Sequence, residues 1–204
     1  GILNAPNIAS GCSCNYPIFT SLALVTMKGV ENWTSNEMVY QGEKIKRLGI
    51  NLGAPGDYKA KKGTLWVDYP SKGGPSPKVP VKVTPENPAW FYHHSARVQG
   101  PHAGFVTGSG ALGLEKISIL LGDKNRKGVY TVRLFFSENK GASTGDRIQT
   151  ISIQNKPVLK NYDILKEVSL PGVGVVKEFK NIKITNGELL IGLTADVGKT
   201  LLCG

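Results

Sequence analysis

Short apolar runs separated by turn signals dominate the second half of the chain. Tyr130, Val132 and Leu134 recur at every second position, which is the period of a strand with one buried face. Asn186-Gly187 lies between two such runs, and this dipeptide is a strong hairpin signal. The pattern predicts strands over residues 117–121, 128–136, 146–153, 175–179, 181–185 and 188–193.

The first half contains shorter candidate strands and more proline. Val79, Val81 and Val83 alternate within a Pro-rich stretch, and prolines confine such a strand to the edge of a sheet. The apolar run at residues 21–27 predicts a buried strand, whereas residues 28–47 show no sustained period. Many short strands without a helical pattern indicate an all-β protein, either a sandwich or a jelly roll.

Composition supports a folded chain and excludes some classes of partner. The 204 residues are 40% apolar and include 25 Gly and 12 Pro, and no run approaches the length of a membrane-spanning helix. The net charge of +10 would attract polyanions. The Lys and Arg residues, however, are scattered over predicted turns and form no nucleic-acid-binding motif. We therefore expect neither membrane insertion nor a nucleic-acid partner.

Three cysteines give an incomplete disulfide framework. Cys12 and Cys14 are too close for an unstrained bridge to each other, so pairing of one of them with Cys203 is easier. Such a bridge would indicate an oxidising compartment and leave the third thiol free or bonded outside the chain. The spacing of the three does not match a zinc site.

Candidate catalytic and metal-binding residues do not assemble into a motif. His93 and His94 are adjacent, so in a strand they point to opposite faces, and no carboxylate stands at matching spacing to them or to His102. Ser109 lies between two glycines but lacks the strand-to-helix context of a nucleophile elbow. The acidic residues lie in turns or at edges, with no preferred glycosidase pair. We expect no catalytic activity, no cofactor and no metal.

Several stretches resemble the malectin domain family. These are VRLFFSE at residues 132–138, GDRI at residues 145–148 and SIQNKPVLKNYDI at residues 152–164. INLG at residues 50–53 and GTLWVD at residues 63–68 are similar to the family's opening strand and its sequel. The resemblance implies a jelly-roll β-sandwich, malectin-like or galactose-binding-like, whose loops at one end bind a short glucan without catalysis.

A narrower resemblance extends to the N-terminal region. Residues 12–25, the turn at residues 53–57 and the Pro-rich loop are similar to C-terminal regions of large secreted bacterial proteins with PQQ-type β-propeller repeats. This implies a fragment without its signal peptide, from a secreted, periplasmic or cell-surface protein. Residues 1–47 would then be an extension packed on the sandwich or a junction to an upstream domain. Residues 48–204 would be the sandwich.

The family's binding residues transfer only in part. Its sugar-stacking aromatic pair follows the stretch matched by residues 132–138, where this chain has Asn139 and Lys140. Neither side chain offers an aromatic plane to the CH face of a sugar. Asp196 stands near the family's late loop aspartate, and its carboxylate would accept hydrogen bonds from sugar hydroxyls.

Three aromatic residues complete the candidate ligand contacts. Tyr58 lies at a predicted turn, and Trp90 and Tyr92 belong to an aromatic cluster after the Pro-rich loop. That cluster offers either a stacking platform or a cap over the sandwich edge. The leading hypothesis is a non-catalytic module that binds a glucan or an acidic polysaccharide. The alternative is an interaction module that docks a neighbouring β-propeller of the same polypeptide and binds no sugar.

Overall fold

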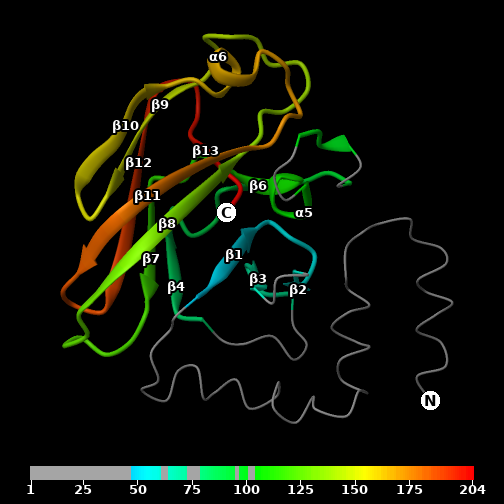
Figure 1. Ribbon diagram of the computed structural model, residues 1–204. Coiled ribbons are helices and arrows are strands. Elements are labelled where there is room, and N and C mark those ends of the chain that lie inside the picture. Colours follow the sequence, from blue (N-terminus) through cyan, green and yellow to red (C-terminus); the bar gives the residue numbers. More distant parts are fainter. Residues whose placement is uncertain (1–46, 61–63, 73–78, 95–96, 101–103) are drawn as a thin grey trace, which may run out of the picture.

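The computed structural model describes residues 47–204, except residues 61–63, 73–78, 95–96 and 101–103 (Figure 1). The predicted strand at residues 21–27 and all but the last residue of the expected extension at residues 1–47 lie outside this range. The described chain is an all-β jelly-roll sandwich, as the strand pattern predicts, with two short helices. Among its helices, none is long and apolar enough to cross a membrane.

One layer of the sandwich is a five-stranded sheet with the order β10-β9-β12-β7-β4. Every neighbouring pair in it is antiparallel. Of the three alternating valines, Val81 and Val83 form the predicted edge strand and Val79 precedes it. Among the described strands, β4 pairs with β7 alone. The bounds of these strands are β4 Val81–Thr84, β7 Lys116–Leu120, β9 Ile148–Ile153, β10 Lys156–Tyr162 and β12 Glu188–Val197.

The other layer consists of two groups of strands joined by the last residues of the chain. β8 (Gly128–Phe136) pairs with β11 (Val175–Ile184). β1 (Gly49–Leu52) and β2 (Tyr58–Lys59) flank β3 (Leu65–Tyr69).

Cys203 and Gly204 connect the two groups. The Cys203 N–H donates to the Phe135 carbonyl (2.9 Å), and the Phe135 N–H donates to the Gly204 carbonyl (2.8 Å). On the opposite side, the Leu52 N–H donates to the Cys203 carbonyl (2.9 Å). A single extended segment therefore lies between β8 and β1, where Figure 1 marks the C-terminal end.

A small sheet and two helices complete the described chain. β6 (Ser109–Leu112) lies between β5 (Ala89–Tyr92) and β13 (Leu201–Leu202). Helix α5 covers Gly104–Thr107 and helix α6 covers Ile164–Val168. The Asp163 side chain caps α6 by accepting hydrogen bonds from the first backbone N–H groups of the helix. The pattern of hydrophobic residues missed both helices because each is about one turn long.

Two local predictions differ from the structure. The runs at residues 175–179 and 181–185 form one strand, β11, which an irregularity between Phe179 and Ile182 bends without ending it. The Asn186-Gly187 turn does not close a hairpin, because β11 pairs with β8 whereas β12 pairs with β7 and β9. The turn is held instead against the β7–β8 loop, where the Gly187 N–H donates to the Arg126 carbonyl (2.9 Å). It therefore carries the chain from one layer to the other.

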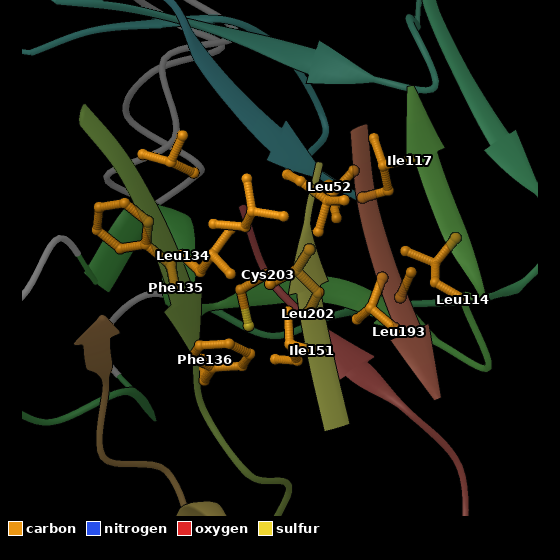
Figure 2. Close-up of a cluster of buried hydrophobic side chains, with 14 of the residues drawn as sticks. Leu52, Leu114, Ile117, Leu134, Phe135, Phe136, Ile151, Leu193, Leu202 and Cys203 are labelled. Atoms are coloured by element: carbon orange, nitrogen blue, oxygen red, sulfur yellow. The ribbon is translucent and has the colours of Figure 1, made fainter. Parts of the chain in front are cut away.

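The hydrophobic core fills the space between the layers. Phe136 and Ile151 are fully buried and come from opposite layers, and Figure 2 shows them in one cluster with Leu202 and Cys203. Trp66 packs against this core from β3, with its ring edge-on to Phe135 at 5.1 Å between centroids. Strands from sequence positions far apart therefore share one core, and each layer depends on the other for burial.

A matched pair of leucines tests this description of the core. Leu114 is fully buried, whereas Leu170 is 61% exposed. We expect Leu114→Ala to lower the free energy of unfolding by about 2–5 kcal/mol, because it leaves a cavity. Leu170→Ala should change it by less than about 0.5 kcal/mol. Urea unfolding measures both, and similar losses from the two variants would contradict the placement of the core.

Candidate functional site

A pocket of about 300 Å³ lies where β8 ends, and it is the best candidate for a ligand site. Its wall combines the segment after β8, the end of β5, the following loop, helix α5 and the loop after α6. An apolar ring, hydrogen-bonding side chains and two cationic groups therefore meet in one cavity, as ligand pockets require. The lining residues are Phe91, His93, Arg97, Val98, Thr107, Ser137, Glu138, Asn139, Lys140 and Gly172.

A buried ion pair fixes the loop that follows β8. The Arg147 Nε donates to Glu138 Oε2 at 2.8 Å, and the exposed fraction of the Glu138 side chain is only 2%. The Asn139 N–H donates to the other carboxylate oxygen at 3.0 Å, and Arg147 also donates to the Lys199 carbonyl. A buried carboxylate needs such partners to offset the loss of hydration. Glu138 is therefore a structural anchor of the pocket and brings no uncompensated charge to it.

Asn139 is held in place from the opposite wall. The His93 Nε2 donates to Asn139 Oδ1 at 3.2 Å, and the His93 backbone N–H donates to the Gly108 carbonyl at 2.7 Å. The Phe91 ring lies beside the His93 ring, with 5.7 Å between centroids. The pocket thus presents an aromatic surface next to an amide and an imidazole, which suits a ligand with both CH faces and hydroxyl groups.

The charge of the pocket wall is positive. Arg97 and Lys140 are exposed residues that line it, while the carboxylate of Glu138 is matched by Arg147. The lining therefore holds two cations, and its one carboxylate, Glu138, is already paired with Arg147. Such a site attracts ligands that carry a carboxylate, sulfate or phosphate group.

The structure places the four predicted contact residues outside this pocket. Tyr58 packs its ring against Phe105, with 4.0 Å between centroids. Trp90 lies edge-on to Tyr69 at 6.0 Å, and Tyr92 is 42% exposed. Their role in binding stays a prediction.

Asp196 lies on another strand, β12, where its carboxylate accepts a hydrogen bond from Thr150 Oγ1 at 2.8 Å. It is exposed and does not line the pocket. Its proposed role with sugar hydroxyls is therefore a separate prediction.

The aromatic cluster contributes to the pocket through the residues that alternate with the predicted ones. Successive side chains of a strand point to opposite faces, so Phe91 and His93 share the side of β5 opposite to Trp90 and Tyr92. The sequence reveals the aromatic cluster at residues 90–92 and the two-residue period of a strand, and these define the two faces of β5. Which face meets a ligand depends on the pairing of β5 with β6, which no local signal predicts.

The other chemical candidates have structural roles or fall outside the described chain. The Ser109 hydroxyl is buried and donates to Asn51 Oδ1 at 3.0 Å. In the described ranges, no group of three His, Cys, Asp or Glu side chains is arranged to hold a metal ion, and His102 lies outside them.

Cys203 is buried in the core and has no disulfide partner among the residues that the structure describes. Its Sγ lies 3.9 Å from the Thr107 carbonyl, and burial raises the pKa of the thiol. Cys12 and Cys14 lie outside the described residues, so the pairing with Cys203 stays a prediction.

Comparisons with known proteins identify the class of this domain. A family model of the malectin domain matches residues 122–203, which include β8, the Glu138–Arg147 pair and part of the pocket. The chain therefore contains a malectin-like domain. No curated protein matches the sequence.

Solved structures share the fold. β-Glucuronidase from Bacteroides uniformis aligns with a TM-score of 0.58 at 18% identity, over 76% of this chain and 17% of that one. The ANX2 ectodomain from Arabidopsis thaliana aligns with a TM-score of 0.56 at 15% identity, over 77% and 48%. ANXUR1 from the same plant gives 0.57 at 14% identity, over 77% and 46%. This chain spans less than half the length of each of these structures, and the likeness concerns the fold.

The ion pair that anchors the pocket can be tested with a matched arginine. We expect Arg147→Ala to lower the free energy of unfolding by about 3–5 kcal/mol, because it leaves the buried Glu138 carboxylate without its partner. Arg133→Ala removes one of the two cationic partners of Glu178, which is part of an exposed pair, and should have a much smaller effect. Urea unfolding compares the two variants, and equal losses would show that burial does not make the Glu138 pair special.

Proposed function

We propose that this module binds a glycan, without catalysis, in the pocket at the end of β8. The observation that carries the proposal is the composition of the pocket, in which the Phe91 ring lies beside the hydrogen-bonded pair of His93 and Asn139. Sugars present an apolar CH face and a ring of hydroxyl groups, and this wall complements both. The match of the malectin domain over residues 122–203 supports the same function.

Among glycans, an acidic polysaccharide fits the pocket better than a neutral glucan. Arg97 and Lys140 line it, and Lys140 stands at one of the two positions where the malectin family has a sugar-stacking aromatic residue. An aromatic ring at this position would stack on the sugar, whereas a cation attracts a negatively charged group of the ligand. A uronic acid supplies both a carboxylate and a ring that can lie against Phe91. The overall charge of +10 would further favour encounter with such a polymer.

The wider context is part of the proposal. We place the module in a larger secreted bacterial protein, at the cell surface or in the periplasm, downstream of a PQQ-type β-propeller. The likeness to plant receptor ectodomains supports an extracellular location. In this scheme residues 48–204 form the sandwich and residues 1–47 form the extension or junction. Tyr58, Trp90, Tyr92 and Asp196 would contact parts of a longer glycan beyond the pocket.

A second candidate function is docking of a neighbouring domain without sugar binding. The replacement of the stacking pair by Asn139 and Lys140 favours it, because these side chains lack the aromatic planes that hold neutral sugars. The glycan experiment below separates the two functions.

Binding of charged and neutral oligosaccharides tests the proposed function. We expect oligomers of galacturonic or glucuronic acid to bind more tightly than neutral glucan oligomers in calorimetric titrations. Lys140→Ala should weaken binding of the acidic oligomers about tenfold, because it removes a hydrogen bond to a charged group. Lys124→Ala makes the same change of charge in an exposed turn at the opposite end of β8 and serves as the control.

The salt dependence and the other candidate residues complete the test. Binding that persists at about 0.5 M salt, beyond the range of simple charge attraction, would indicate a built site. If binding disappears at high salt and both lysine variants weaken it equally, the binding is nonspecific attraction by the net charge. If no oligosaccharide binds the folded protein, the docking function replaces the proposal. Tyr92→Ala and Asp196→Ala test the contacts that lie outside the pocket.

A further inference from the structure

Arg97 and Lys140 both line the proposed glycan pocket and are both exposed, but the chain holds them differently. Arg97 lies between two hydrogen-bonded points of the loop after β5. Lys140 lies inside a turn that is closed by a long bond from the Ala142 N–H to the Asn139 carbonyl (3.3 Å). A cation on a fixed backbone loses less freedom on binding than one at the tip of a loop. This difference points to Arg97 as the cation that gives the site its geometry.

Backbone hydrogen bonds fix the loop on both sides of Arg97. On one side, the Arg97 N–H donates to the His94 carbonyl at 2.8 Å. On the other side, both backbone groups of Gln99 bond to the chain that follows α6. The Gln99 N–H donates to the Gly172 carbonyl at 2.7 Å, and the Gln99 carbonyl accepts from the Gly174 N–H at 2.9 Å. The position of Arg97 therefore depends on that chain.

Gly172 connects this loop to the anchored end of β8. The Gly172 N–H donates to the Glu138 carbonyl at 2.8 Å, and the side chain of Glu138 is held by Arg147. Gly172 thus bonds through its N–H to one wall of the pocket and through its carbonyl to the loop that carries Arg97. A continuous series of backbone bonds therefore runs from Glu138 to Gln99, two residues beyond Arg97.

The close approach of the two loops requires a glycine at residue 172. Its φ is +80°, a conformation that residues with a side chain rarely adopt. A Cβ atom added to Gly172 would lie 3.3 Å from the carbonyl oxygen of Arg97, closer than an ordinary van der Waals contact. A side chain at this position would therefore press against the backbone of Arg97.

The guanidinium of Arg97 suits a carboxylate. It presents its N–H donors as a planar fork that matches two carboxylate oxygens, whereas a lysine ammonium acts as a point charge. Among the described residues, no carboxylate forms an ion pair with Arg97. The Phe91 ring lines the same pocket. A uronic acid has a group for each of them, a sugar ring for Phe91 and a carboxylate for Arg97.

We propose that Arg97 determines the preference of the pocket for acidic sugars, by binding the carboxylate of a uronic acid with both arms of its guanidinium. Gly172 is a positioning residue that acts through the backbone of Arg97. Lys140 adds attraction without a fixed geometry. The inference rests on the proposed glycan function and adds to it the group of the ligand that the site recognises and the residue that recognises it.

Trigalacturonic acid and its methyl ester are the ligands that test the role of Arg97, because they share their rings and differ in charge. Titrations followed by NMR measure strong and weak binding alike. We expect Arg97→Lys to weaken binding of the acid about fivefold or more, since lysine keeps the charge and lacks the fork. Binding of the ester should change by less than about twofold, because the ester has no carboxylate for the fork to bind.

Gly172 and Gly113 are a matched pair for the positioning role. Gly113 has nearly the same φ, +79°, but a Cβ there would have no atom within 4 Å, and Gly113 does not line the pocket. Gly172→Ala should weaken binding of the acid about threefold or more, whereas Gly113→Ala should change it by less than about twofold. In an Arg97→Ala background, Gly172→Ala should cause no further loss, because its effect passes through Arg97.

The outcomes distinguish this proposal from the glycan function on which it rests. If the unaltered protein binds neither ligand, both are wrong. If the unaltered protein binds the acid and Arg97→Lys binds it equally well, the role of Arg97 is wrong and the glycan function stands. A further loss from Gly172→Ala in the Arg97→Ala background, or an equal loss from Gly113→Ala, would overturn the positioning role of Gly172. Urea unfolding checks that each variant is folded.

Discussion

The backbone hydrogen bonds of Cys203 and Gly204 hold one layer of the sandwich together. They tie β8 to β1 through a single segment, and so position β8 over the opposite sheet. The proposed glycan pocket lies where β8 ends. The burial of Cys203 and its neighbour Leu202 in the core stabilises the same segment. Loss of this connection would therefore disturb the pocket as well as the fold.

Polar groups at the two ends of β8 find their hydrogen-bond partners in different ways. At the end of the strand, the buried carboxylate of Glu138 is satisfied by Arg147 and by the backbone of Asn139. Along the first half, the backbone groups of Arg133 have no partner on the edge away from β11 among the described residues. A charge cannot remain buried without partners, whereas backbone groups at an open edge can be satisfied by water or by another strand.

The sequence predicts single strands better than their assembly. The alternation over residues 128–136 yields the bounds of β8 because a long strand with one buried face has a clear period. The Asn186-Gly187 turn shows the limit, since turn chemistry fixes the local path of the chain but not which sheet the next strand joins. The pocket residues Phe91 and His93 likewise depend on strand pairing that local sequence signals do not predict. Their face is defined by the pairing of β5 and by loops far away in the sequence, and Arg97 reaches the pocket only through that assembly.

The anchoring of the loop after β8 has a consequence for the evolution of specificity. The ion pair of Glu138 holds this loop in place, whereas Lys140, two residues later, is exposed and contributes little to the core. If the pocket binds a glycan as proposed, mutations at Lys140 would alter its ligand preference without a large penalty in folding. Under that proposed function, selection at a few neighbouring codons would change the ligand while the sandwich stays the same.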